Sequence, residues 1–571
     1  MNSPNPFEFD GAPNLSPQQI RDWFIDDYSY ARFIQSTRNV LLLGQRGSGK
    51  SMTLMYFSLP VQAENSNTQH AGESGTRFIG VYIPCNTPLT HKREYLLFKD
   101  PVTPAILSEH YFVLGIALKL AETVELVAND ITSDEMEYLR ADFEDLFDQD
   151  FNSTENLFRS VRRAINRELR HTQEIINKDE RNSAEYRART FYTLIIPMMS
   201  ALKEVKAFKN AHFLLMIDDA HDLNQYQRMS LNSWLSYRDH SLFSLKVAIA
   251  KVSDYDFRTA SSGTILEGHD YTAIDLEQPF QNYDSRFGKL AREIVGRRLK
   301  IAGINVGPDE FFPESQDFAK AMEKCNKEAE EFARKTLPNP TAKNISDYRY
   351  KQARALYFRA RSTKANRPVY SGMDTIVHLS TGVIRNLLDP CYWMYDDMHS
   401  RVEPGAVFQE VPSSVQSEVI LRRSEQLWEK IRRGLDKEVE GCTNIQARKI
   451  LHLFENLGVL FRERLLKHKS EPRVVTFSIS GRTERYDLEL KPLIDISRRA
   501  QLLYVRSGNA KDDGKREDYY TPNRMLWPAI GLDAHGQHGR IYLPERDILA
   551  AANGKPFPYV DDEEQQGSLF S

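Results

Sequence analysis

A glycine-rich loop near the start of the chain has the residue types and spacing that bind phosphate groups. Residues 44–51 read G-x-x-x-x-G-K-S and directly follow the apolar run 40–43. In such a loop, backbone N–H groups at a helix start converge on phosphate oxygens, the Lys50 ammonium reaches the β- and γ-phosphates, and the Ser51 hydroxyl binds Mg²⁺. The pattern predicts a site for ATP and Mg²⁺, and a chance glycine turn is the alternative. The predicted nucleotide contacts come from Gly44, Gln45, Arg46, Gly47, Ser48, Gly49, Lys50, Ser51 and Met52.

Two acids at the end of another apolar run supply the rest of the expected chemistry. Residues 213–217 are all apolar, and Asp218 and Asp219 follow them. In P-loop proteins a strand that ends in such acids lies beside the phosphate site, so we expect Asp218 to bind Mg²⁺ together with Ser51. We expect Asp219 to polarise the water that attacks the terminal phosphate. For the acids alone, a strand end closed by a turn is the alternative.

Polar residues after the next apolar run are further candidates for phosphate contacts. Residues 245–250 predict a buried strand, and Lys251 and Ser253 follow it. Arg258, in the same loop, is the candidate for an arginine finger that reaches the nucleotide of a neighbouring subunit, with Arg238 as a second candidate. The alternative for Arg258 is a loop arginine exposed to solvent.

A further arginine lies at a predicted turn between two helices. Residues 376–388 predict a helix, a Ser380-Thr381-Gly382 turn and a second helix with Arg385 in its first turn. An arginine at this place can bind the phosphates and respond to their loss. A surface arginine without a nucleotide contact is the alternative.

These side chains require a parallel sheet whose strands end at one edge. Apolar runs predict strands at 40–43, 78–83, 213–217, 245–250 and 272–276. Helical periodicity continues through 106–205, which predicts a large helical insertion that is either a partner surface or a structural annex. Ser16, Pro17 and Gln19 have the pattern of a helix start, for a helix over 15–33. The expected fold class is α/β: a P-loop parallel sheet flanked by helices, with the insertion, a helical lid and a C-terminal winged-helix-like α+β domain.

Length and composition predict a multidomain protein without a membrane span. The chain has 571 residues, 41% hydrophobic content and a net charge of −4, and its four cysteines lie far apart. The start of the chain lacks the pattern of a signal peptide, so we expect a cytoplasmic protein with reduced thiols. The expected parts are an N-terminal lead-in and helix (1–38), the P-loop core (39–280), the lid with a charged insertion (281–400), the winged-helix-like region (410–560) and an acidic disordered tail (561–571).

The C-terminal third is the expected nucleic-acid interface. Predicted helices at 415–435 and 444–457 precede alternating segments at 459–466 and 473–479, which suggests a winged helix with its hairpin there. Residues 414–524 contain 23 basic and 17 acidic residues, a local excess of 6 positive charges in an acidic chain. Duplex DNA is the expected partner, and a solvated surface of mixed charge is the alternative. The candidates for phosphate contacts are Arg462, Arg464, Lys467, Lys469 and Arg473.

The P-loop, the acid pair and the Ser-Thr-Gly turn with Arg385 together resemble the AAA+ ATPases of the origin-recognition and replication-initiator clade. The resemblance covers about residues 39–395 and implies hydrolysis of Mg-ATP by Lys50, Ser51, Asp218 and Asp219, with Arg385 as the second sensor on the lid. We also expect a homo-oligomer. Bacterial relatives of this clade occur on mobile elements and in defence loci. The chain departs from the pattern because Asp219 replaces a glutamate, the insertion is large, and no first-sensor asparagine follows residue 250. The acid pair is also similar to that of the signal-transducing STAND ATPases, which turn over slowly.

The main functional expectation is an ATP-driven switch that acts on or near DNA. The alternatives are a STAND-like ATPase that regulates a partner effector without touching DNA, and a scaffold that holds ATP without hydrolysing it. The tail segment 566–570, which begins with Gln566 and ends with Leu569 and Phe570, resembles peptides that dock on the sliding clamp.

Overall fold

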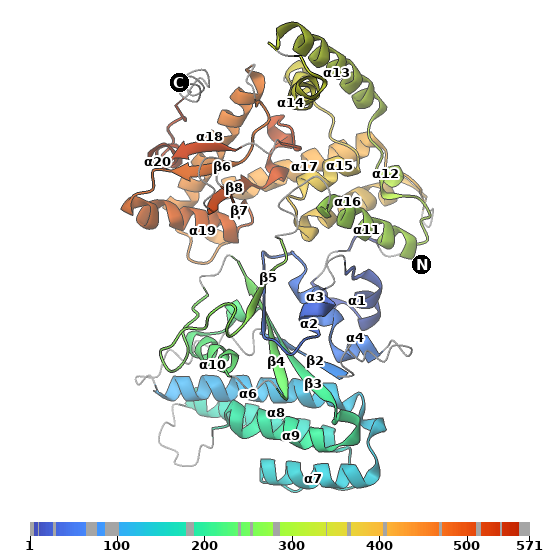
Figure 1. The fold of residues 1–571 in the computed structure, drawn as a ribbon, viewed down its shortest axis with the longest axis vertical. Helices are drawn as coiled ribbons and strands as arrows, with labels where there is room; N and C mark the ends of the chain where they lie inside the picture. Colours follow the sequence, from blue (N-terminus) through green and yellow to red (C-terminus); the bar gives the residue numbers. More distant parts are fainter. Residues whose placement is uncertain are drawn as a thin grey trace. The chain divides into compact units, whose positions relative to one another are not determined.

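The computed structural model divides into two compact units. The N-terminal unit contains residues 10–278, and the C-terminal unit contains residues 279–571 together with residues 1–9. The chain is drawn in Figure 1. The structure describes residues 5–8, 11–26, 30–63, 77–85, 102–178, 188–237, 241–251, 255–277, 286–338, 340–361, 367–403, 408–467, 471–509, 516–536 and 540–558.

A five-stranded parallel sheet forms the centre of the N-terminal unit. Its strand order is β2-β3-β4-β1-β5, and every pair of neighbours is parallel. All five predicted strands are present, and parallel strands place their carboxyl ends at one edge. The strands are β1 (Val40–Gly44), β2 (Arg77–Pro84), β3 (Ala211–Asp218), β4 (Phe243–Ala250) and β5 (Thr272–Asp275).

Both faces of this sheet are buried, which explains why its strands are continuously apolar rather than alternating. On β1, Leu41 belongs to a core that includes Phe112 and Trp234. Its neighbours Val40 and Leu42 point to the opposite face, where they meet a second core that includes Leu54. Successive side chains of a strand alternate between the faces, so one apolar run can serve both cores.

One face is covered by the helices around the P-loop. They are α1 (Pro17–Trp23), α2 (Ala31–Ile34), α3 (Lys50–Tyr56) and α4 (Leu59–Ala63). Ser16 caps α1 as predicted: its side chain accepts from the Gln19 N–H, and the Gln19 side chain accepts from the Ser16 N–H. The single helix predicted over 15–33 is wrong, because α1 ends at Trp23 and Phe24 adopts an extended backbone.

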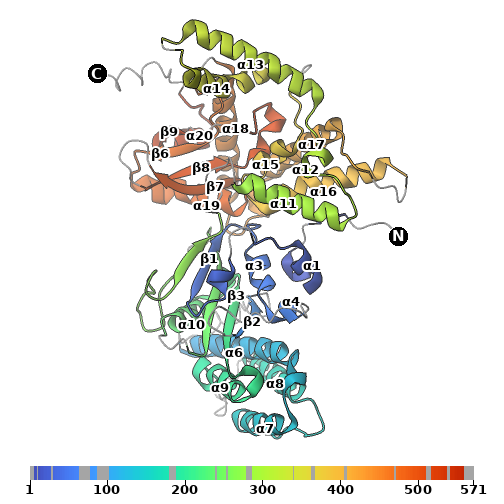
Figure 2. The same ribbon diagram turned by 45° about the vertical axis from the view of Figure 1, so that its right-hand side comes forward.

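The helical insertion covers the other face. It consists of α6 (Val102–Glu125), α7 (Ser133–Phe147), α8 (Leu157–Lys178) and α9 (Ile196–Glu204), and the described part of 106–205 contains no strand, as predicted. Helix α6 packs along α8 and also contacts β2 and α10 (Gln225–Leu235), and α6 and α8 lie side by side in both views (Figures 1 and 2). Among the described helices, only α6 is long and apolar enough to cross a membrane, and 61% of its most apolar window is buried inside the protein.

The C-terminal unit begins with the predicted lid helices. They are α11 (Arg286–Ile301), α12 (Pro308–Phe311), α13 (Gln316–Thr336), α14 (Ala342–Ala360), α15 (Met373–Leu379) and α16 (Ile384–Arg401). Helices α13 and α14 form a long antiparallel hairpin (Figure 2). The N-terminal end of the chain packs here as well: Phe7 is fully buried against Phe311, Phe312 and Tyr395.

A winged-helix-like α+β domain completes this unit. A sheet of order β7-β8-β6-β9 packs with helices, and β7 and β8 form an antiparallel hairpin. The elements are α17 (Ser413–Arg433), α18 (Asn444–Leu466), β6 (Phe477–Ser480), α19 (Lys491–Arg499), β7 (Leu503–Asn509), β8 (Arg516–Pro522), β9 (Ile541–Pro544) and α20 (Glu545–Ala552).

The hairpin of this domain is not where the sequence predicted it. Residues 459–466 belong to α18, because the apolar residues Leu457, Phe461 and Leu465 continue the helical spacing and are buried. Gly458 does not end the helix. It allows close packing, since a methyl group added there would come within 2.9 Å of the Ile530 side chain.

Candidate nucleotide site

Backbone conformation at two glycines shapes the predicted phosphate loop. Gly47 has φ +83°, and Gly49, which directly precedes α3, has φ +100°. Glycine adopts these left-handed conformations without a steric penalty. Gly44 has a different requirement: a methyl group on it would collide with the Ser48 hydroxyl. The loop therefore places its backbone at the start of α3, where N–H groups without intrahelical partners face outward.

The Lys50 ammonium is held by the loop itself. Its Nζ donates to the carbonyl oxygens of Gly44 at 3.0 Å and Gln45 at 3.1 Å. Burial lowers the pKa of Lys50, while the carboxylates of Asp219 and Asp218 act to raise it. The predicted lysine and the predicted acids therefore lie close enough to interact, although they are separated by most of the N-terminal unit in sequence.

Asp218 is held by two donors. The Tyr82 hydroxyl donates to its Oδ2 at 2.7 Å, and the Asp219 N–H donates to its Oδ1 at 3.0 Å. Burial and the neighbouring Asp219 raise the pKa of Asp218, whereas Ser51, Tyr82 and Lys50 act to lower it. Helix α3, which begins at Lys50, packs against β3, which ends at Asp218, as the motifs predicted.

Asp219 has a strained and partly exposed position at the same edge. Its φ is +53°, in the left-handed region, and its side chain is 47% exposed. His221 lies beneath it, with its Nδ1 4.0 Å from Asp219 Oδ1 and its Nε2 3.6 Å from Asp222 Oδ1. Burial lowers the pKa of His221, so it is a neutral imidazole near pH 7. An exposed carboxylate beside a buried one suits the two roles expected for the acid pair.

The residues present fit a nucleotide with Mg²⁺. The Ser48 hydroxyl is buried in the loop without a hydrogen-bond partner, and Lys50 occupies only carbonyls of the loop. Ser51 in the first turn of α3 provides a hydroxyl oxygen and Asp218 at the end of β3 provides carboxylate oxygens, the kind of ligand that Mg²⁺ prefers. When bound, the ion would neutralise charge on the phosphate oxygens. Lys50 would orient the phosphates, and Asp219 would orient a water.

Comparison with known proteins decides the family. A family model described as ORC-CDC6-like matches residues 5–352 and 318–543. The chain belongs to the ORC-CDC6-like family. It is therefore an AAA+ ATPase of the origin-recognition and replication-initiator clade, as its motifs suggested.

Solved structures with low similarity accompany this match. One is the Aeropyrum pernix Orc1 protein in complex with DNA, with 11% identity, a TM-score of 0.27 and coverage of 90% of both chains. Another is Cdc6p from Pyrobaculum aerophilum, with 11% identity, a TM-score of 0.30 and coverage of 92% of this chain and 96% of that one. No curated protein matches the sequence. The match to the family model, and not these structures, shows that the chain belongs to the ORC-CDC6-like family.

Several residues of this ORC-CDC6-like site were missed by the sequence analysis. Tyr82 lies on β2, where the run 78–83 predicted only a buried strand. Glu277 follows β5 and accepts from the Gln45 N–H at 2.6 Å. Lys251, a candidate for contact with the γ-phosphate or the attacking water, has its Nζ 2.6 Å from Asp275 and 3.3 Å from Glu277. No short motif marks these contacts, because each depends on which strands become neighbours.

The predicted arginines have different surroundings. Arg258 is 62% exposed and forms a two-pronged ion pair with Asp256, at 2.6–3.0 Å, within its own loop. Arg385 is half-buried in the first turn of α16, in the C-terminal unit. Arg238 and Ser253 lie outside the described residues.

The turn before Arg385 is held by the winged-helix-like domain. Thr381 is fully buried with φ +55°. Its carbonyl accepts from Arg506 Nη2 at 2.6 Å, and its hydroxyl accepts from the Arg524 N–H at 3.1 Å. On α16, Asn386 donates to the Tyr504 hydroxyl at 2.7 Å. The lid turn of this ORC-CDC6-like protein is thus fastened directly to β7 and to the segment after β8.

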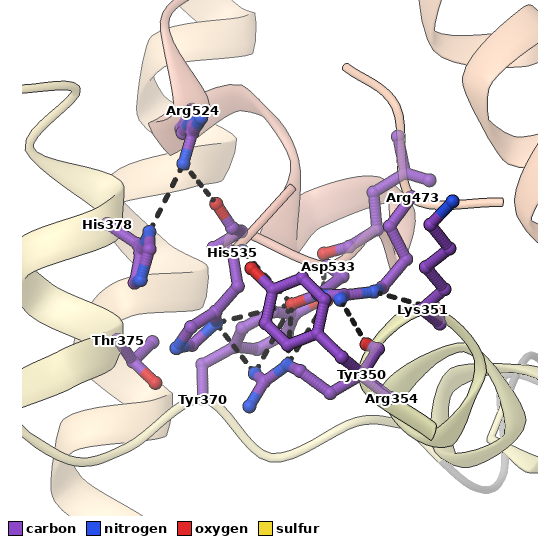
Figure 3. Close-up of polar contacts among 12 residues, drawn as sticks. Tyr350, Lys351, Arg354, Tyr370, Thr375, His378, Arg473, Arg524, Asp533 and His535 are labelled. Atoms are coloured by element: carbon purple, nitrogen blue, oxygen red, sulfur yellow. Dashed lines mark hydrogen bonds and ion pairs between the residues drawn. The ribbon is translucent and has the colours of Figure 1, made fainter. Parts of the chain in front are cut away.

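A buried ionic cluster makes a second junction in the same unit (Figure 3). Asp533 accepts from Arg354 Nε on α14 at 3.2 Å and from Arg473 Nη1 at 3.2 Å. Arg354 Nη2 also lies 2.6 Å from His535 Nδ1, and the His535 ring lies 4.2 Å from that of His378 on α15. Burial alone would raise the pKa of Asp533, but Arg354, His535 and Arg473 hold it well below its ordinary value.

This cluster corrects one predicted DNA contact. Arg473 is only 3% exposed, and it binds Asp533 and the Tyr350 carbonyl. Its guanidinium is therefore bound inside the protein and cannot contact a DNA phosphate. Arg464 is half-buried and donates to the Glu471 carbonyl at 3.0 Å. Arg462 and Lys467 are exposed, and Lys469 lies outside the described residues.

Removal of the Tyr82 hydroxyl is expected to make ATP turnover more sensitive to acid. In Tyr82→Phe, Asp218 loses a donor that stabilises its ionised form, so its pKa rises further and it becomes protonated at a higher pH as the solution is acidified. Loss of this charge-assisted hydrogen bond is expected to lower kcat/KM about tenfold at acidic pH. The pH–rate profile checks this, with Tyr138→Phe on the exposed face of α7 as the control. An unchanged acid limb would contradict the role of Tyr82.

Proposed function

We propose that this protein binds and hydrolyses ATP and uses the cycle to switch its contact with DNA. The observation that carries the proposal is the packing of α3, which begins at Lys50, against β3, which ends at the buried Asp218. It places a phosphate loop, its lysine and an acid pair at one edge of the sheet. Membership of the ORC-CDC6-like family supports the same chemistry.

Hydrolysis in this proposal is slow. Asp219 provides the carboxylate that orients water, but its side chain is one methylene shorter than the glutamate usual in the family. A water held by a shorter arm lies less well in line with the phosphorus atom, and small misplacements of reacting groups reduce rates strongly. Arg385 completes the switch as a sensor on the lid, and Arg258 serves a neighbouring subunit once it has left Asp256.

The winged-helix-like domain carries the signal to DNA. Thr381 precedes Arg385 by one turn and is bound by Arg506 and Arg524. A change in the conformation of the lid turn would therefore act directly on β7 and on the segment after β8. The local excess of 6 positive charges in 414–524 supports duplex DNA as the partner.

ATP hydrolysis measured with and without duplex DNA tests this function. Stimulation by DNA supports the switch. Stimulation only by a protein component would instead support the second candidate, a STAND-like signalling ATPase with an effector partner. The presence of Asp219 at a position where the family usually has a glutamate is the observation that favours this second candidate. A role in phage defence or on a mobile element, and a cytoplasmic location, are part of the proposal for either candidate.

The exposed charges at the end of α18 are expected to contribute to DNA affinity. In the double variant Arg462→Gln with Lys467→Gln, duplex DNA should bind about tenfold more weakly, because two contacts with DNA phosphates are lost. Each lost contact should also reduce the magnitude of the slope of log K against log salt by about 0.9. A titration by fluorescence anisotropy at several salt concentrations measures both quantities. The control is Lys324→Gln with Lys327→Gln on α13, which removes two exposed charges outside the proposed interface. Equal effects of the two double variants would contradict this interface.

Two further partners belong to the proposal without a described structure. The clamp-like segment 566–570 lies outside the described residues. A homo-oligomer would be needed for Arg258 to reach a second nucleotide, and sedimentation with and without ATP tests for it.

A further inference from the structure

Glu277 contacts the phosphate loop although it lies 232 residues from its partner in sequence. Its Oε1 accepts from the Gln45 N–H at 2.6 Å, and its Oε2 lies 3.3 Å from Lys251 Nζ. The residue is only 3% exposed. A buried carboxylate bound to a backbone N–H of the loop is therefore part of the loop's own framework.

The position of Glu277 is fixed by the sheet. The Leu276 N–H donates to the Leu43 carbonyl at 2.9 Å, which extends the pairing of β5 with β1. The Glu277 N–H donates to Asp275 Oδ1 at 2.9 Å, and Asp275 Oδ2 also binds Lys251 at 2.6 Å. Lys251 in turn donates its N–H to the Gly44 carbonyl at 3.3 Å. Residues at the ends of β4 and β5 thus form hydrogen bonds with the start of the loop and hold it in place.

Two side chains of opposite charge bind the backbone N–H and the backbone carbonyl of Gln45. Glu277 binds its N–H, and Lys50 binds its carbonyl and that of Gly44. A lysine that donates all three of its N–H groups to phosphate oxygens leaves these carbonyls. After it has left, Glu277 is the charged group that still fixes the orientation of the peptide between Gly44 and Gln45.

We propose that Glu277 is a positioning residue for ATP, which keeps the first peptide of the loop in its receptive orientation while Lys50 moves to the phosphates. This inference rests on the proposed ATP binding. The essential feature is the reach of the carboxylate to the Gln45 N–H, and the negative charge is secondary.

A matched pair of variants separates reach from charge. Glu277→Gln keeps an oxygen at the same distance and loses the charge, whereas Glu277→Asp keeps the charge and shortens the side chain by one methylene. Binding of a fluorescent ATP analogue to the full chain gives the Kd of each variant, and thermal unfolding without nucleotide gives its stability. Glu277→Asp is expected to raise the Kd about tenfold or more, because the buried Gln45 N–H loses its acceptor, and Glu277→Gln should stay within about threefold of wild type.

The opposite order would overturn the inference. A residue that served only as an ion-pair partner for Lys251 would tolerate aspartate and fail with glutamine, in stability as well as in affinity. Equal affinities of both variants and wild type would also overturn it. Glu277→Ala is a second variant that removes the acceptor, and it should weaken binding as much as Glu277→Asp. Absence of ATP binding by the wild-type protein would instead overturn the proposed function, and the inference with it.

Discussion

Replacement of Lys50 by alanine is expected to lower kcat/KM for ATP hydrolysis by about 100-fold to 1,000-fold, the usual loss when a donor to the transition state is removed. The Lys50 ammonium lies near enough to the acid pair for the carboxylates of Asp219 and Asp218 to act on its pKa. No other described side chain of the loop offers a buried cation, since Arg46 is exposed. Steady-state phosphate release, with ATP varied, measures the effect.

The fold should tolerate this change. Burial disfavours the charged form of Lys50, and its hydrogen bonds go only to the carbonyls of Gly44 and Gln45 in the loop. We therefore expect an unfolding midpoint close to that of wild type in the absence of nucleotide. Lys119→Ala, which removes a half-buried lysine paired with Glu122 on α6, is the matched control for activity. Full hydrolysis by Lys50→Ala would show that the loop is not the ATP site.

Replacement of Asp533 by alanine is expected to destabilise the C-terminal unit strongly. The change leaves the guanidinium groups of Arg354 and Arg473 beside each other without their shared carboxylate, and the Arg473 side chain is only 2% exposed. Removal of one partner from a buried ion pair costs about 3–5 kcal/mol, so the unfolding midpoint of this unit should fall by roughly 10 °C. Differential scanning calorimetry of the full chain, in which the N-terminal unit is an internal reference, measures the shift.

Two variants show whether buried charge is the cause. Asp533→Asn keeps the size and an acceptor oxygen, so its loss of stability should be smaller than that of Asp533→Ala. Glu323→Gln breaks an exposed ion pair with Lys327 on α13 and should change the midpoint little, because solvent screens such pairs. If Asp533→Ala melted like Glu323→Gln, the cluster would not be an important junction of this unit.

The local pattern of the sequence determined much of the N-terminal unit. The five strands follow from continuous apolar runs, the cap at Ser16 follows from the residues around it, and the loop at 44–51 follows from its glycines. Each of these features depends on residues close together in the chain. The pairing of the loop with Asp218 was also predictable, because parallel strands bring their carboxyl ends to one edge.

In the C-terminal unit the local pattern was ambiguous. Residues 459–466 read as a strand, but the long-range packing of Leu457, Phe461 and Leu465 extended α18 through them. Arg473 read as a surface charge, and only the presence of Asp533, 60 residues away, allows it to be buried. A short segment cannot show which distant group will compensate a charge.

The sequence by itself therefore determined the chemistry of the site: the phosphate loop, its lysine and the acid pair. Only the tertiary structure decided which side chains hold these groups in place, namely Tyr82 on Asp218, Glu277 on the loop, and Arg506 and Arg524 on the turn before Arg385. The physical reason is that motifs record contacts between neighbours in the chain. Supporting contacts join residues that become neighbours only when strands and helices pack.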